Sequence, residues 1–314
     1  MRYGTPYKGS KNSIAEWVYS HFPKTDNFYD LFAGGCAITQ RALMKQEYKK
    51  YFCNDLNNEG IRLFLDAIYG KFETENRWIE REVFFRDKEK EPYIKYCWSF
   101  GNNGRDYLYS QELEPYKKAW HYAIYFHDYS LSKKLGFDLS VIDEIPDTYT
   151  RYLESKRIIE SVVHNENISR YQVIERMQQL EALTRLQSLQ SLQSLQSLQS
   201  LQSDFSKVEI LPNSILYCDI PYKDTNGYEK TKGKSCFNFD RFYSWCKDQK
   251  ELVIISEYTM PETDFICIDE INKAVTFQGG AGNSAIERLF IPVHQKDLWE
   301  SYGYKKWVQP SLFD

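Results

Sequence analysis

An apolar run that ends in an acid, a proline and an aromatic ring is the feature that most limits how this chain can fold. The run occupies residues 215–217, and Asp219, Ile220, Pro221 and Tyr222 close the segment. Such a run predicts a buried strand, and parallel α/β sheets bind their ligands at the carboxyl ends of their strands. There the Asp219 carboxylate and the Ile220 carbonyl can accept hydrogen bonds from an exocyclic amine, and Tyr222 can stack on a planar base. An ordinary turn after a strand is the simpler alternative.

A strand, a glycine turn and the start of a helix are predicted over residues 28–39. Gly34 and Gly35 allow tight backbone angles and the close approach of a ligand. The segment lacks the Gly-Lys-Ser/Thr end of a P-loop and the third glycine of the dinucleotide fingerprint. A second short strand ends in Asp55, at the position where doubly wound sheets hold ribose hydroxyls. A helix cap is the alternative role for this carboxylate.

The N-terminal residues 3–11 precede a predicted amphipathic helix at residues 13–22. Ser10 and Ser13 are candidate caps of this helix. Lys11 lies near the helix N-terminus, an end that favours anions, so a lysine at this place indicates a bound carboxylate. A solvated surface lysine is the alternative.

These motifs, in this order along the chain, resemble those of the Dam-type DNA adenine-N6 methyltransferases, enzymes of bacteria and phages that use S-adenosylmethionine. The resemblance covers the chain up to about residue 60 and from about residue 204 onward. It implies an α/β fold: a mostly parallel Rossmann-like methyltransferase sheet with an inserted helical target-recognition domain. The residues that it assigns to the cofactor S-adenosylmethionine are Tyr7, Lys11, Asp30, Phe32, Ala33, Gly34, Asp55 and Asp219.

The resemblance also assigns a reaction to the segment that begins at Asp219. It implies that Asp219, Ile220, Pro221 and Tyr222 form the catalytic motif and bind the target adenine. The family usually has Asp-Pro-Pro-Tyr, and Ile220 stands in place of the first proline. The chemistry needs the backbone carbonyl at this position, which isoleucine supplies. The implied reaction is methyl transfer from S-adenosylmethionine to N6 of adenine in double-stranded DNA.

Three regions follow from this resemblance and from the change of composition along the chain. Residues 1–69 and 204–314 are expected to form the catalytic domain, and residues 70–167 the inserted target-recognition domain. Residues 168–203 are expected to form a helical segment that contains Leu-Gln-Ser repeats. An aromatic stripe at residues 120–126 is expected to lie in a core.

Two loops carry the candidate DNA contacts. Residues 96–107 predict a turn, because Asn-Gly favours left-handed backbone angles. Asn102, Asn103 and Arg105 are the candidates there, since amides pair with adenine and arginine with guanine; a purely structural turn is the alternative. Lys232, in a lysine-rich loop, is a candidate phosphate contact or else a solvated side chain.

Residues 186–203 are six consecutive Leu-Gln-Ser units, and leucines at 180 and 183 extend the spacing to eight leucines. A period of three does not match 3.6 residues per turn, so the leucine stripe drifts by ~60° per unit around an α-helix. We therefore predict a helix with an imperfect apolar face or a partly irregular segment, with a strand at residues 201–205. A neutral spacer of loosely controlled length is the first interpretation. A packed element is the alternative, because eight leucines are a large apolar load.

Composition limits the setting of the protein. The seven cysteines are odd in number and irregularly spaced, which favours reduced thiols over a disulfide framework or a zinc site. No metal is expected. The chain has no run of eighteen apolar residues, so no membrane partner is expected, and a cytoplasmic location in a bacterial cell or phage-infected host is predicted.

Two other functions remain open from the sequence. One is a methyltransferase that acts on RNA or on a protein amide. The other is a DNA-binding protein with a decayed catalytic site, suggested by Ile220 and by the net charge of −4, since a basic balance is the usual footprint of DNA binding.

Overall fold

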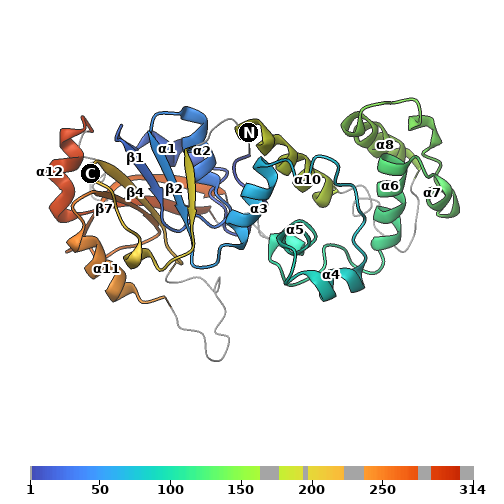
Figure 1. Cartoon of the computed structure of the whole chain (residues 1–314). Helices are drawn as coiled ribbons and strands as arrows, with labels where there is room; N and C mark the ends of the chain where they lie inside the picture. The colour runs from blue at the N-terminus through green and yellow to red at the C-terminus, as the bar shows by residue number, and fades with distance from the viewer. Residues whose placement is uncertain (1, 163–176, 194–196, 223–236, 275–283, 305–314) are drawn as a thin grey trace, which may run out of the picture. The chain divides into compact units, whose positions relative to one another are not determined.

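The computed structural model describes residues 2–162, 177–193, 197–222, 237–274 and 284–304 (Figure 1). The chain divides into two compact units, each with a hydrophobic core of its own. Unit 1 comprises residues 1–5, 9–65 and 191–314, and unit 2 comprises residues 6–8 and 66–190.

Unit 1 is built on a seven-stranded sheet with the strand order β3-β2-β1-β4-β5-β7-β6. The strands are β1 (Asn27–Asp30), β2 (Lys50–Asn54), β3 (Leu198–Leu201), β4 (Ser214–Asp219), β5 (Leu252–Glu257), β6 (Phe265–Ala274) and β7 (Ser284–Pro292). The first five strands in this order pair in parallel, and β7 pairs antiparallel with both β5 and β6. The predicted α/β fold with a mostly parallel sheet is confirmed.

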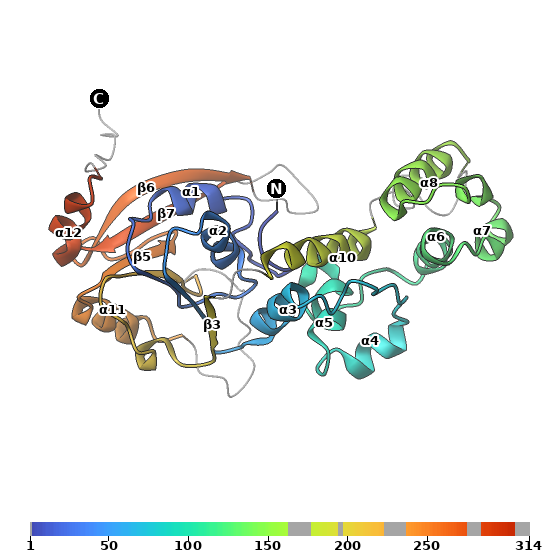
Figure 2. The ribbon, with the colours of Figure 1, turned by 45° about the horizontal axis from the view of Figure 1, so that its top comes forward.

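Helices cover both faces of this sheet, which explains why its central strands β1, β4 and β5 are buried along almost their whole length. On one face, Phe28 and Tyr217 have their rings 5.6 and 5.4 Å from that of Phe22, which follows helix α1 (Ala15–Ser20). On the other face, Tyr29 of β1 packs in one cluster with Phe242 of helix α11 (Phe239–Asp248). Figure 2 shows α1 and α2 (Ala37–Lys45) on the side of the sheet opposite α11.

The N-terminal helix differs in detail from its prediction. The helix predicted at residues 13–22 is shorter, Ala15–Ser20, and its N-cap is Ile14, where no side chain makes a capping hydrogen bond. The predicted caps Ser10 and Ser13 are therefore wrong. The reason is that residues 11–14 form a turn closed by the Ile14 amide on the Lys11 carbonyl, which displaces the helix start.

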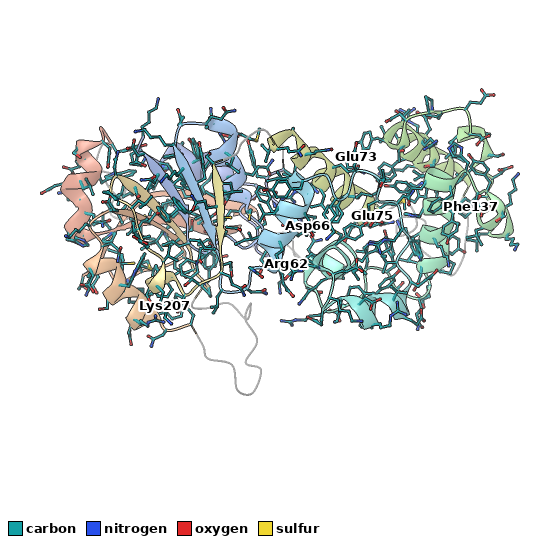
Figure 3. All side chains as sticks on the ribbon, viewed as in Figure 1. Arg62, Asp66, Glu73, Glu75, Phe137 and Lys207 are labelled. Atoms are coloured by element: carbon teal, nitrogen blue, oxygen red, sulfur yellow. The ribbon has the colours of Figure 1, made fainter. Side chains whose placement is uncertain are left out.

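Unit 2 is helical in its described residues. Its helices are α4 (Arg81–Asp87), α5 (Pro92–Cys97), α6 (Glu114–Phe126), α7 (Ser130–Lys134), α8 (Thr148–Val162) and α10 (Gln178–Ser188), and α3 (Glu59–Ile68) runs from unit 1 into it. Its core includes Trp120, which stacks on Tyr152 at 5.4 Å, and Phe137, labelled in Figure 3, which stacks on Tyr116. The aromatic stripe of α6 lies largely in this core, as expected, although Phe126 is exposed.

The Leu-Gln-Ser repeat takes three conformations. It continues α10 to Ser188, forms a 3₁₀ helix at Leu189–Leu192, and forms the edge strand β3 at Leu198–Leu201, parallel to β2. The described leucines of the repeat stripe that precede the strand are nearly fully buried: Leu180, Leu183, Leu186, Leu189 and Leu192.

This arrangement corrects two predictions about the repeat. The helical segment predicted to reach residue 203 is wrong at its end, because β3 begins at Leu198, three residues before the predicted strand. The described leucines of the helical part are packed, which favours the packed interpretation over the spacer. The stripe stays buried because the helix tightens to 3₁₀ at Leu189, where a period of three keeps leucines on one line.

Candidate active site

The carboxyl ends of β1 and β4 form the centre of the site. Chain order reverses between these two adjacent strands, since β2 and β3 lie on one side and β5 on the other. Ligands of doubly wound sheets bind at such a reversal. Asp30 is the last residue of β1 and Asp219 the last residue of β4, so the fold brings two predicted site residues together although 189 positions separate them.

Asp30 is a buried carboxyl with one oxygen in use. Its Oδ2 accepts hydrogen bonds from the backbone N–H of Thr39 (3.2 Å) and from the Thr39 hydroxyl (2.7 Å). Its Oδ1 is buried and has no hydrogen-bond partner in the described residues. Burial raises the pKa of Asp30 to about 7, and the charges of Asp219 and Asp55 add to the rise. A buried acceptor of this kind suits a ligand that carries a donor, such as an ammonium group.

The glycine turn lies between β1 and α2 and is held from two sides. The Gly34 amide, at φ +47°, donates to Asp55 Oδ2 at 2.8 Å, and Asp55 Oδ1 accepts from the Asn57 amide at 2.9 Å. On the N-terminal side, a Cβ added to Gly4 would lie 2.2 Å from the Gly35 carbonyl oxygen. Only glycine fits at position 4, because the backbone there touches the turn.

The remaining cofactor candidates differ in burial and in the unit to which they belong. Ala33 is 7% exposed and donates its amide to the Asn54 carbonyl. Phe32 is half-buried, with its ring 5.5 Å from that of Phe205. Tyr7 belongs to unit 2, where its ring lies 5.1 Å from that of Tyr96.

Lys11 does not lie on the surface, as its alternative interpretation required. Its side chain is 4% exposed, and its Nζ lies 2.7 Å from Asp219 Oδ1 and 3.5 Å from Glu287 Oε1. Burial alone would lower the pKa of Lys11, but Asp219 and Glu287 together outweigh it and the pKa is raised. The lysine is therefore a buried cation, and its counterions are protein carboxylates.

Tyr222 completes this cluster. Its hydroxyl donates to Glu287 Oε1, Lys11 Nζ lies 4.5 Å above its ring, and the Tyr258 ring meets it edge-on at 4.4 Å. Burial, with the charge of Asp219, raises the pKa of Tyr222 far above its ordinary value. The ring is thus fixed at its hydroxyl end, next to the acid of the same motif.

Ile220, which stands in place of the usual proline, is held by packing. Its side chain is 1% exposed and belongs to the core cluster that contains Leu31 and Phe242. Pro221 and Tyr222 follow with partial exposure. Isoleucine therefore anchors the motif by packing, where proline would restrict the backbone.

The asparagine side chains of the predicted recognition turn make hydrogen bonds within the turn itself. Asn102, at φ +55°, donates from Nδ2 to the Tyr96 carbonyl at 2.8 Å. Asn103 Oδ1 accepts from the amides of Arg105 (2.7 Å) and Asp106 (3.2 Å). These bonds fit the structural alternative for both asparagines, while Arg105 is exposed. Lys232 lies outside the described residues.

Glu287 is the site residue that the sequence motifs did not indicate. It lies on β7 and its side chain is 0% exposed. The signal available in the sequence was an acid that, with the adjacent Arg288, interrupts an apolar stretch at residues 285–293.

Some other ligands receive no support from the described part of the chain. It contains no group of three or more His, Cys, Asp or Glu side chains that could hold a metal ion, and every cysteine described is free. Among these residues no helix is both long and apolar enough to cross a membrane.

A doubly wound sheet with a glycine turn after β1 and carboxylates at the ends of β1, β2 and β4 defines a Rossmann-like fold of the kind that binds nucleotide cofactors. The D12 class N6 adenine-specific DNA methyltransferase family matches residues 7–244, and the chain belongs to this family. The family resemblance inferred from the motifs is confirmed, and with it adenine-specific DNA methylation as the function. Among curated proteins none matches the chain.

Proposed function

We propose that this chain transfers the methyl group of S-adenosylmethionine to N6 of adenine in duplex DNA, with Asp219 as the side-chain acceptor of the adenine amine. The observation that carries this assignment is the position of Asp219 at the end of β4, beside the reversal of strand order. Membership of the adenine-specific family supports the reaction. The rival substrates, RNA and protein amides, have no comparable support.

The residues around the glycine turn fit the cofactor. Asp30 Oδ1, a buried acceptor, would accept from its ammonium group, and Asp55, after β2, would hold its ribose hydroxyls. Phe32, Ala33 and Gly34 would line its methionine part. When bound, S-adenosylmethionine supplies an electrophilic methyl group on a positively charged sulfur.

For two of the predicted cofactor residues, Lys11 and Tyr7, the described contacts are with protein groups. Lys11 is already paired with Asp219 at 2.7 Å, so a contact with the methionine carboxylate would use another of its three N–H donors. Tyr7 belongs to unit 2, and its contact with the cofactor remains part of the proposal.

The chemistry that falls to the protein is positioning. An aromatic amine is a poor nucleophile because its lone pair is delocalised into the ring. Hydrogen bonds from the amine to Asp219 and to the Ile220 carbonyl would draw the nitrogen toward tetrahedral geometry and aim its lone pair. Tyr222 would stack on the base and fix its plane. Orientation of this kind supplies up to ~7–11 kcal/mol of the barrier in favourable cases.

Residues 70–167 would provide target recognition, as their place in the family order implies. Arg105 is exposed and suits a base or phosphate contact, and Asn102 and Asn103 would then support the turn that presents it. Lys232 would contact phosphate. Double-stranded DNA in a cytoplasm is the expected partner.

The test is methylation by the whole chain with radiolabelled S-adenosylmethionine on duplex DNA, transfer RNA and protein extract, with N6-methyladenine identified in the product. We expect label in DNA alone, and none with Asp219→Ala. Asp264→Ala is the matched control, because Asp264 forms only a partly exposed ion pair with Lys247 (2.9 Å), and such pairs stabilise by ~0–1 kcal/mol. Label in transfer RNA or protein but not in DNA would refute the proposal, and cofactor binding without turnover on any DNA would support a decayed site.

A further inference from the structure

Glu287 is a buried carboxylate beside the catalytic motif that the family match does not include, since the match ends at residue 244. It lies on β7, the antiparallel strand between β5 and β6. A carboxylate with 0% exposure is stable only when it is paired and hydrogen-bonded. Its partners therefore indicate what it is for.

Both described partners of Glu287 Oε1 belong to the proposed machinery. One is the hydroxyl of Tyr222, the ring expected to stack on adenine. The other is the ammonium of Lys11 at 3.5 Å, which lies closer, at 2.7 Å, to the catalytic Asp219. One buried cation is thus shared between two carboxylates, and only one of these carboxylates is needed for the adenine amine.

This sharing solves a problem that adenine binding creates. In the described state Lys11 donates to Asp219 Oδ1; the carboxylate has further acceptor sites for N6, but a turn of Asp219 toward N6 moves Oδ1 away from Lys11. Were Asp219 the only counterion, its turn toward the amine would leave a buried ammonium unpaired, an unfavourable state. Glu287 gives Lys11 a second counterion within 3.5 Å.

We propose that Glu287 is a positioning residue for adenine methylation: it holds Lys11 when Asp219 turns to the adenine amine, and it fixes the Tyr222 hydroxyl so that the ring is ready to stack. The role rests on the proposed function of Asp219. Glu287 lies on β7, outside the residues that the family match covers.

Glu287→Gln tests the charge, because glutamine keeps the size and can still accept from the Tyr222 hydroxyl. We expect its first-turnover rate on unmethylated duplex DNA, at saturating DNA and cofactor, to fall by about ten- to a hundredfold. The dissociation constant of S-adenosylmethionine, measured by calorimetry, should change by less than about threefold. A change in this constant as large as the fall in rate would instead indicate a general loss of structure. Glu270→Gln is the matched control, because Glu270 lies on the neighbouring strand β6 and pairs with Arg288 at 2.9 Å.

A second comparison separates positioning from folding. In a Lys11→Met background the charge of Glu287 has lost its cation, so Glu287→Gln should no longer lower the rate. If Lys11→Met has no measurable rate, Tyr222→Phe is used as the background, because this change removes only the hydroxyl. The double variant Tyr222→Phe with Glu287→Ala should then be no slower than Glu287→Ala alone.

Each outcome decides a different question. If the wild-type chain methylates adenine and Asp219→Ala does not, the same assay supports the proposed function. An unchanged rate in Glu287→Gln, or a rate lost together with cofactor affinity and melting temperature, would overturn the role of Glu287 alone. No methylation of any DNA by the wild-type chain would overturn both.

Discussion

The length of the Leu-Gln-Ser repeat gives the sharpest test of the fold. We consider chains with one unit added, one removed and two removed, for instance residues 189–194. Because the units are identical, both ends of the repeat keep their sequence in every variant: the 3₁₀ helix still ends in a leucine, and β3 still reads Leu-Gln-Ser-Leu. The only change is the number of residues between Leu192 and Leu198, which is five, residues 193–197, in this chain.

The three variants therefore differ in kind. An added unit lengthens the connection to eight residues, at a closure cost well below ~1 kcal/mol. One removed unit leaves two residues. Removal of two units deletes six residues, one more than the connection contains, so the end of the 3₁₀ helix or of β3 must unwind. If Leu189 and Leu192, now 0% and 6% exposed, lose their burial at ~1.5–3 kcal/mol each, the free energy of unfolding falls by about 3–6 kcal/mol.

Thermal unfolding followed by circular dichroism measures this series. At roughly 2–4 °C per kcal/mol for units of this size, removal of two units should lower the melting temperature by roughly 6–24 °C, while the added unit should change it by little. Leu192→Ala and the exposed neighbour Gln193→Ala provide the paired control. A two-unit deletion that melts with the wild type and methylates DNA would refute the packed interpretation and restore the spacer.

Four further predictions concern single residues. Because burial raises the pKa of Asp30 to about 7 and an ammonium group prefers the ionised acid, the affinity for S-adenosylmethionine should rise about tenfold per pH unit from pH 5 to 7 and then level off; calorimetry at several pH values checks this, and an equal slope in Asp30→Asn would contradict it. Asp55→Ala should weaken cofactor binding by roughly ten- to a hundredfold, with DNA affinity in gel-shift titrations unchanged. Ile220→Ala should lower the free energy of unfolding by about 2–5 kcal/mol in denaturant titration, since the side chain is buried. Arg105→Ala should weaken DNA binding and lower its salt slope by about 1, and an unchanged slope would remove this contact.

The sheet was predictable because parallel strands covered on both faces leave a strong signal. Continuous apolar runs ending in acids identified β1, β2 and β4 and placed Asp30, Asp55 and Asp219 at their ends, since the carboxyl ends of parallel strands share one edge. The pairing of Lys11 with Asp219 was not predictable, because 208 positions separate them and no local pattern links them. Glu287 was missed for the same reason: its role depends on β7 entering the sheet between β5 and β6.

The repeat shows where local sequence carries no information at all. The tripeptide Leu-Gln-Ser is helical at residues 186–188 and extended at residues 198–200. Propensity is the same in both places, so the surroundings decide: α10 packs against helix α5, and residues 198–201 pair with the edge of β2. The repeat sequence by itself does not predict where the helix ends and the strand begins.

The electrostatics of the sheet edge bear on how DNA can be modified by an acidic chain. Asp219 and Glu287 flank the buried Lys11, and the charges of Asp219 and Asp55 act on the nearby carboxyl of Asp30. This excess of carboxyl groups favours a cofactor with a cationic sulfur and ammonium, and it repels phosphate. A target adenine is neutral, so on the proposed function we expect it to enter this edge by leaving the duplex while its phosphates stay outside, which is the geometry of base flipping. The acidity that argues against DNA binding in the whole composition is thus compatible with a site that admits the base alone.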